Sequence, residues 1–124
     1  MVELFLVRHG ETWENREGIL QGHMPGHLTP LGVQQADALR RQLEGESFDV
    51  LLASDLARTV ATARVLNEAF KLPLTTTALL RERDWGPLTG CRIADVPKAP
   101  FPPGVESVEA MAGRARCFLW GLGW

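Results

Sequence analysis

The sequence opens with an apolar run that ends abruptly at two charged residues. Between Val2 and Val7 only Glu3 is polar, and the run stops at Arg8 and His9. An almost continuous apolar run is typical of a strand that is buried on both faces, as in a parallel sheet covered by helices. We therefore predict a buried first strand and an α/β fold.

The charged pair lies where a ligand is expected. Parallel α/β sheets bind ligands just beyond the carboxyl ends of their strands. Arg8 and His9 would be costly to desolvate there unless an anion or a carboxylate meets them. A strand that surfaces into a polar turn could also carry such a pair. That simpler interpretation does not account for Gly10, which allows close backbone approach, or for the hydrogen-bonding side chains of Thr12 and Asn15.

Helical and strand-like segments then alternate along the chain. Thr29 and Pro30 are typical of an N-cap followed by a first helical residue, and they predict a helix over residues 30–44. Short strands are predicted over residues 50–53 and 74–77. With a helix between these two strands, the order is strand, helix, strand, helix, strand, which requires a parallel sheet with right-handed crossovers.

Capping residues and prolines set the remaining boundaries. Ser54 and Asp55 are predicted to cap the helix that follows the second strand. The region 85–104 contains five prolines, which exclude a long helix. Ser107 then opens an amphipathic helix. We expect one domain over residues 1–124, long enough to bury roughly two-thirds of its unfolded surface.

Composition excludes several classes of partner. The chain is 45% hydrophobic and 23% charged, with a net charge of −2, and nothing in this balance attracts nucleic acid or an acidic membrane. Strand-like sequence from Val2 leaves no room for a signal peptide, and no apolar run approaches a membrane span. Cys91 and Cys117 are too few for a disulfide framework or a zinc site. We expect a cytoplasmic protein that binds neither nucleic acid nor membrane.

Strand ends that meet at one edge of the sheet would bring charged groups together. Arg58 falls in the first turn of a predicted helix, where the helix dipole favours an anion by a few tenths to about 1 kcal/mol, so a negative group should compensate it. Guanidinium groups and helix amino termini are common binders of phosphate. A neutral histidine can act as a nucleophile, and a glutamate can protonate a leaving oxygen. The pattern predicts a phosphate pocket formed by Arg8, His9, Asn15, Arg58 and Glu82.

Several of these residues also have a simpler interpretation. Helix arginines are usually solvated, so Arg58 could form a surface ion pair. Glu82 lies between two arginines and could belong to a charged turn. His23 and His27 are separated by a proline and a glycine, which exclude the helical spacing of a zinc pair. The aromatic tail over residues 118–124 could be core or an adhesive surface.

Four ordered blocks of sequence resemble the histidine phosphatase superfamily, in its phosphoglycerate mutase-like branch. They are LVRHGETWEN, ILQGHMPGHLTPLGVQQA, LLASDLARTVATA and LLRERDWGPLTG, and the later PPGVES is similar to the family's PPGGES. The similarity covers the chain from Val2 to about Leu119. The resemblance implies a three-layer α/β/α fold with a mostly parallel sheet.

The resemblance also implies roles for the residues that match the family's motifs. His9 would accept the phosphoryl group, and Glu82 would be the proton donor. The phosphate would be bound by Arg8 and Arg58, with help from Asn15. The substrate mouth would be lined by Gln21, Gly22 and Thr29. In the family the phosphoryl group passes to histidine and then to water or another hydroxyl without a metal or other cofactor, so positioning and charge neutralisation provide the catalysis.

One family feature has no counterpart after Glu106. The family's second catalytic histidine lies in a V-x-H-G motif, at the end of a later strand that is inserted between the first and second strands. Loss of an active-site donor typically lowers the rate by about 10²-fold to 10³-fold, and a sheet without that strand has open edges. We therefore expect a domain that is incomplete at its C-terminus, lacks the later strands and self-associates as a homo-oligomer.

Two kinds of function fit these patterns. The first is a phosphohydrolase of small phosphorylated metabolites that acts through a phosphohistidine on His9. The alternative is a truncated, weakly active or inactive phosphate-binding relative, or a phosphoglycerate mutase, which is an isomerase. The segment between Gly90 and Pro103 is short where the family often has a helical lid. An open mouth favours a phosphatase over a mutase, because a mutase must keep its intermediate from water.

Overall fold

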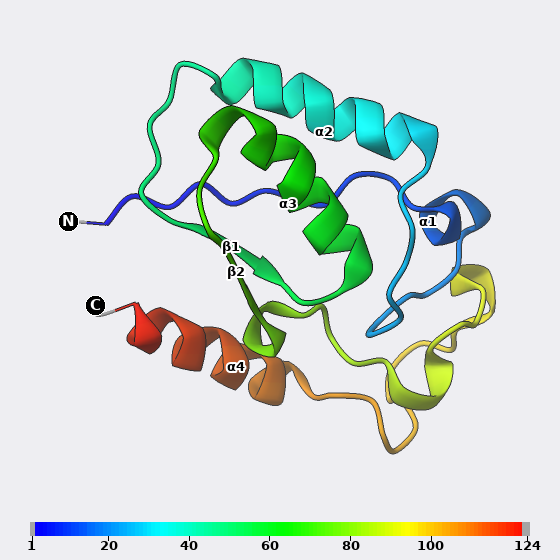
Figure 1. The fold of residues 1–124 in the computed structure, drawn as a ribbon. Helices are drawn as coiled ribbons and strands as arrows, with labels where there is room; N and C mark the ends of the chain where they lie inside the picture. Colours follow the sequence, from blue (N-terminus) through cyan, green and yellow to red (C-terminus); the bar gives the residue numbers. More distant parts are fainter. Residues whose placement is uncertain (1, 123–124) are drawn as a thin grey trace.

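The structure is a computed structural model that describes residues 2–122. Its elements in chain order are α1 (Trp13–Glu17), α2 (Pro30–Leu43), β1 (Leu51–Ser54), α3 (Ala57–Phe70), β2 (Leu74–Thr77), the 3-10 turns η1 (Ala78–Leu80), η2 (Gly86–Leu88) and η3 (Ile93–Asp95), and α4 (Val108–Gly121). Helices α2 and α3 pack together at one end of the molecule, and α4 lies at the other end beside η1 (Figure 1). No helix in the described range is both long and apolar enough to cross a membrane.

Strands β1 and β2 form a small parallel sheet. Leu51 lies opposite Leu74, and Ser54 lies opposite Thr77. Helix α3 connects the two strands and packs against both, as a crossover between parallel strands must. The predicted α/β class is confirmed, as are both strands, with β1 one residue later than expected.

The apolar run at the start of the chain does not form the predicted buried strand. Figure 1 shows it in dark blue as an irregular trace that passes α3. Leu6 is 93% exposed, whereas Phe5 packs edge-on against Phe48, which packs in turn against Phe70. A strand needs a neighbour for its backbone N–H and C=O groups, and within the described residues β1 and β2 pair only with each other. The prediction of a buried first strand is therefore wrong.

Local capping signals place α2 and α4 where the sequence predicts them. The hydroxyl of Thr29 accepts a hydrogen bond from the backbone N–H of Gly32 at 3.0 Å, with proline at the first helical position. The hydroxyl of Ser107 accepts from the N–H of Ala110 at 3.0 Å. Both helices therefore begin with one of their free N–H groups satisfied by a side chain.

Helix α3 begins later than expected, and its predicted cap is wrong. Its N-cap is Leu56, which has no side-chain oxygen. The carboxylate of Asp55 instead binds the guanidinium of Arg81 at 2.6 and 2.7 Å. The backbone carbonyl of Pro25, from a distant loop, accepts from the N–H of Arg58 at 3.0 Å. A tertiary contact thus replaces the local cap.

Buried polar side chains are concentrated around the start of α3. The buried apolar residues of the core are Ala36, Ala53, Leu56, Ala63 and Leu66. The buried polar residues come from the loop between residues 10 and 29 and from the junction of β1 with α3: Thr12, Gln21, Thr29, Ser54, Arg58 and Thr62. Buried polar groups need hydrogen-bond partners, so this region holds a buried polar network.

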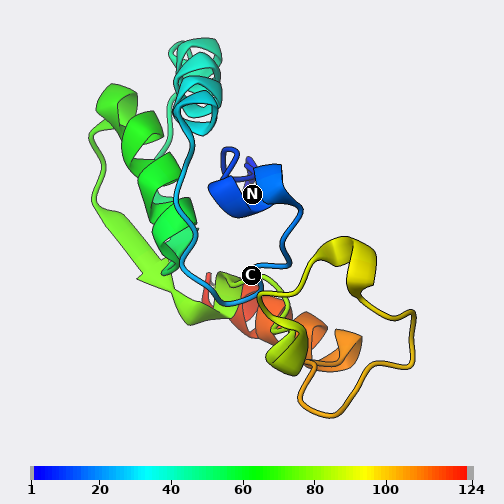
Figure 2. The same cartoon turned by 90° about the vertical axis from the view of Figure 1, so that its right-hand side faces the viewer.

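Figure 2 shows the segment between η2 and α4 as an extended loop at the edge of the molecule, away from α2 and α3. Between residues 90 and 103 the only regular element is the η3 turn. The predicted absence of a long helix from this proline-rich region is confirmed.

Candidate active site

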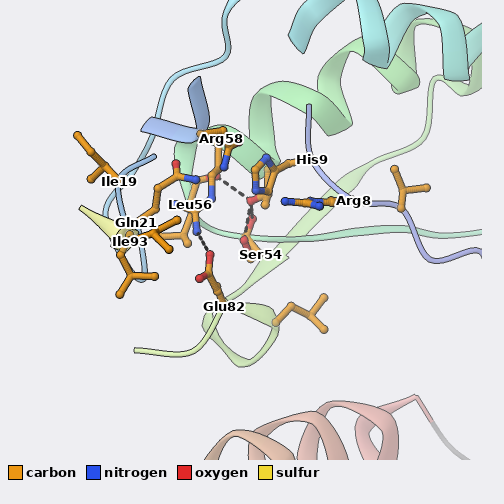
Figure 3. A pocket seen from close by; sticks show the side chains of 14 residues that line it. Arg8, His9, Ile19, Gln21, Ser54, Leu56, Arg58, Glu82 and Ile93 are labelled. Atoms are coloured by element: carbon orange, nitrogen blue, oxygen red, sulfur yellow. Dashed lines mark hydrogen bonds and ion pairs between the residues drawn. The ribbon is translucent and has the colours of Figure 1, made fainter. Parts of the chain in front are cut away.

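One cavity brings together six of the eight predicted site residues. It has a volume of about 460 Å³ and lies between the residue 8–21 region, the start of α3 and the turn after β2 (Figure 3). The predicted residues in its lining are Arg8, His9, Asn15, Gln21, Arg58 and Glu82. Three separate regions of the chain contribute these side chains, which explains why no single motif outlines the cavity.

Gly22 and Thr29 lie outside this lining. The carbonyl of Gly22 accepts a hydrogen bond from the guanidinium of Arg58 at 2.8 Å. Thr29 is fully buried, and its hydroxyl donates to the carboxylate of Glu11 at 2.7 Å. Gly22 thus contacts the lining residue Arg58, and Thr29 contacts Glu11, but neither of them lines the cavity.

Arg58 is the buried centre of the cavity. Only 1% of its side chain is exposed, so the interpretation as a solvated surface arginine does not hold. One guanidinium nitrogen donates to the carboxylate of Glu82 at 2.9 Å, and the other donates to the carbonyl of Met24. Burial lowers the pKa of Arg58, and the charge of Glu82 opposes this shift. The negative group that compensates the charge of Arg58 at this helix start is therefore Glu82.

The Nε of Arg58 has no hydrogen-bond partner among the described residues, although it is buried. An unsatisfied buried donor costs about 1–3 kcal/mol.

His9 has one nitrogen fixed by the backbone. Its Nδ1 lies 2.6 Å from the carbonyl oxygen of Gly10. A carbonyl can only accept, so Nδ1 carries the proton and Nε2 keeps its lone pair. Burial lowers the pKa of His9, and the positive charges of Arg58 and Arg8 act in the same direction. These shifts favour the neutral imidazole, whose Nε2 has no hydrogen-bond partner among the described residues.

The backbone beside His9 is anchored to α3 and α2. The N–H of Gly10 donates to the hydroxyl of Thr62 at 3.1 Å, and this hydroxyl donates to the carbonyl of Arg58 at 2.8 Å. A Cβ atom at Gly10 would overlap the carbonyl oxygen of Gly32. Sequence reasoning missed Thr62 and Gly32, although Thr62 lies one helical turn after Arg58, a spacing that brings side chains to one helix face.

Two amide side chains line the same cavity. Asn15 and Thr12 form a reciprocal capping box at the start of α1, in which the Asn15 Oδ1 accepts from the Thr12 N–H at 3.0 Å. The Oε1 of Gln21 accepts from the Thr12 hydroxyl at 2.9 Å. With both carbonyl oxygens engaged, the groups left for a ligand are the two NH₂ donors.

Both carboxyl oxygens of Glu82 have hydrogen-bond donors. Its Oε2 accepts from Arg58 and its Oε1 accepts from the indole N–H of Trp85 at 3.2 Å. The neighbouring arginines have other partners. Arg81 binds Asp55, and the Arg83 guanidinium lies 4.7 Å from the centre of the Trp85 ring. A simple charged turn therefore does not describe this segment.

Figure 3 shows the guanidinium of Arg8 directed towards His9, with Glu82 beneath Arg58. Within residues 2–122, no group of three or more His, Cys, Asp or Glu side chains is placed to hold a metal ion. The charged lining therefore consists of two guanidinium groups and one carboxylate around a neutral imidazole. This is the composition of a phosphoryl-transfer site.

Comparison with known proteins agrees with this class of site. The family model for the histidine phosphatase superfamily (branch 1) matches residues 4–122. The chain belongs to this family, as its sequence motifs predict.

Its relatives are longer proteins. The adenosylcobalamin/alpha-ribazole phosphatase of Escherichia coli (strain K12) is 41% identical over 85 residues, which are 68% of this chain and 42% of that one. A probable phosphoglycerate mutase of Proteus mirabilis (strain HI4320) is 36% identical over 134 residues, covering 96% of this chain and 62% of the relative.

Solved structures share the fold. The crystal structure of the alpha-ribazole phosphatase from Shigella flexneri has a TM-score of 0.81 and 30% identity, covering 94% of this chain and 65% of that one. The mycobacterial glucosyl-3-phosphoglycerate phosphatase with VO3 has a TM-score of 0.84 and 31% identity, over 92% of this chain and 63% of that one. The chain therefore spans between 42% and 65% of the length of these four relatives.

Proposed function

We propose that this chain forms the phosphate pocket and the nucleophile of a phosphohydrolase that acts on small phosphorylated metabolites. The observation that carries the proposal is the hydrogen bond between His9 Nδ1 and the Gly10 carbonyl, which leaves Nε2 as a free nucleophile beside the buried Arg58. The family supports the same chemistry, since the relatives named above include two kinds of phosphatase.

The proposed reaction assigns a task to each of the six predicted residues that line the cavity. Arg8 and Arg58 bind the phosphate oxygens, and the amides of Asn15 and Gln21 donate to them. The lone pair of His9 Nε2 attacks phosphorus, so an N–P bond forms as the bond to the ester oxygen breaks.

A proton is needed on the departing oxygen, and Glu82 supplies it. The negative phosphate displaces part of the Arg58 contact and favours proton uptake by this carboxylate. Water then attacks the phosphohistidine, phosphate leaves, and Glu82 takes back a proton from that water.

A phosphoglycerate mutase is the second candidate function, and the relative from Proteus mirabilis favours it. The loop between residues 90 and 103, with only the η3 turn as regular structure, favours hydrolysis. A mutase must retain its phosphohistidine away from water, which a closed lid provides.

We further propose that residues 1–124 are one part of a larger histidine phosphatase domain, because the relatives contain more chain. Turnover by this part alone is expected to be slow but measurable, since phosphate binding and phosphorylation of His9 need only the residues of the cavity.

We also infer that the protein is cytoplasmic and that it self-associates. The exposed thiols of Cys91 and Cys117 suit a reducing compartment. The exposed apolar segment around Leu6, together with Trp120, which is 72% exposed, supports association between copies.

The function is tested with p-nitrophenyl phosphate and a pair of histidine variants. His9→Ala removes the nucleophile, whereas His27→Ala removes an exposed loop histidine as a matched control. We expect the unmodified chain and His27→Ala to release nitrophenolate and to carry an acid-labile phosphoryl group. His9→Ala should lose both signals by about 10³-fold or more. Equal labelling of the two variants would contradict the proposal.

A further inference from the structure

The backbone that carries Glu82 is held by a side chain from the far end of the chain. Arg114 lies on α4, which packs beside η1 in the turn after β2 (Figure 1), and its guanidinium hydrogen-bonds to this turn. It donates to three backbone carbonyls within 3.2 Å, those of Leu79 at 3.0 Å, Arg81 at 3.0 Å and Glu82 at 3.2 Å. The last two belong to the peptide groups on either side of the Glu82 Cα atom, so one guanidinium fixes both.

Glu106 holds this guanidinium in place. Its carboxylate binds Arg114 in bidentate fashion, at 2.6 and 2.7 Å. It also accepts from the backbone N–H of Asp84 at 3.0 Å, while the Glu106 N–H donates to the Asp84 carbonyl at 2.8 Å. The two side chains are only 20% and 14% exposed. The planar fork of arginine suits this arrangement, whereas the point charge of lysine does not.

A second side chain, from the loop before α2, also contacts the backbone of Glu82. The Nε2 of His23 lies 2.8 Å from the Glu82 carbonyl oxygen, which only accepts, so His23 is the donor. The neighbouring carbonyls of Gly22 and Met24 accept from Arg58. One loop therefore contacts both members of the Arg58–Glu82 pair.

Backbone anchoring matters here because the side chain of Glu82 is 41% exposed. Its carboxylate contacts are with Arg58 and Trp85, and a bound phosphate would compete for Arg58. Proton transfer needs a heavy-atom distance of about 2.6–3.2 Å, and a misplacement of about 1 Å can cost about 10²-fold in rate. Arg114 contacts backbone carbonyls, for which a phosphate anion does not compete.

We propose that Arg114, with Glu106 as its partner, is a positioning residue for proton donation by Glu82. The proposal rests on the proposed function, in which Glu82 protonates the leaving oxygen. The proposed role is more than attachment of α4 to the fold, because it links Arg114, which lies outside the cavity, to protonation of the leaving oxygen.

Esters with different leaving groups separate positioning from simple stabilisation. Nitrophenolate leaves p-nitrophenyl phosphate without needing a proton, whereas the alkoxide of glycerol phosphate must be protonated as it leaves. We expect Arg114→Lys to lower kcat for glycerol phosphate by about tenfold more than kcat for p-nitrophenyl phosphate, with little change in KM. Glu106→Gln should show the same selectivity. Arg116→Lys, an exposed site on the same helix, is the control and should change neither rate.

Thermal unfolding of each variant is followed by circular dichroism alongside the rate measurements. If Arg114→Lys is poorly folded, the rates of Glu106→Gln provide the test instead. Equal loss for both esters, no loss for either, or unfolding of both variants would overturn the positioning role. Hydrolysis of p-nitrophenyl phosphate alone by the unmodified chain would also overturn it, while leaving the His9 chemistry intact. Failure of the unmodified chain to react with either ester would contradict the proposed function itself.

Discussion

At the scale of single residues, the protonation of His9 decides whether the site can react. Burial lowers the pKa of this imidazole from the ordinary value of 6.5, and Arg58 and Arg8 add to the shift. A lowered pKa means that the neutral, nucleophilic form persists as the pH falls. We predict that His9 titrates with a midpoint below about 6.5 when followed by NMR. A midpoint at or above that value would contradict the lowering of the His9 pKa by burial.

The backbone at Gly10 leaves no room for a side chain. Because a Cβ atom there would overlap the Gly32 carbonyl, we predict that Gly10→Ala destabilises the fold by about 1–3 kcal/mol. Gly45→Ala is the control, since nothing lies within 4 Å of a Cβ atom at that position. It should stay within about 0.5 kcal/mol of the unmodified chain. Urea unfolding compares the two, and equal midpoints would argue against the close approach.

At the scale of elements, the attachment of α4 depends on pH. Hydrogen bonds from Arg114 lower the pKa of Glu106 from 4.5 to about 2. A carboxylate whose pKa is lower in the folded state stabilises it fully above its unfolded value, and this contribution disappears as the pH falls towards the folded value. We predict that the difference in Tm between the unmodified chain and Glu106→Gln shrinks between about pH 5 and about pH 2. A difference that stays constant over this range would contradict the ion pair.

The elements that could be predicted from sequence are those whose signals are local. Thr29 and Ser107 cap their helices with their own hydroxyls, so both starts were predictable. The start of α3 was not, because its cap comes from Pro25 through a tertiary contact. The run over residues 2–7 has strand propensity, but pairing depends on a neighbour that propensity does not supply.

The same reasoning applies to the candidate site. His9 and Arg58 were predictable because His9 directly follows an apolar run and Arg58 is a cation in the first turn of a helix. Thr62 and Arg114 were not, because their importance comes from backbone groups distant in the chain that they contact. Gly22 contacts Arg58 but does not line the cavity. The spacing of a sequence motif does not show which of these two positions a residue takes.

At the scale of the whole molecule, the exposed apolar segment around Leu6 is where we expect copies of the protein to associate. We predict that Leu6→Lys leaves stability within about 0.5 kcal/mol, since Leu6 is 93% exposed. Leu66→Ala, at a position only 5% exposed, should cost about 2–5 kcal/mol.

Light scattering of the same Leu6→Lys variant tests association directly. The unmodified chain should form oligomers at micromolar concentration, and Leu6→Lys should shift it towards the monomer. An unmodified chain that is monomeric throughout would contradict self-association through this segment.

The account as a whole depends on His9 as the phosphoryl acceptor. Peptide mass spectrometry after brief incubation with a phosphomonoester and an alkaline quench tests this most directly, because phosphohistidine survives base and is lost in acid. We predict a single phosphoryl group on the peptide that contains His9, absent from His9→Ala. A phosphoryl group on His23 or His27, or an unmodified His9 under conditions where the ester is hydrolysed, would contradict the account.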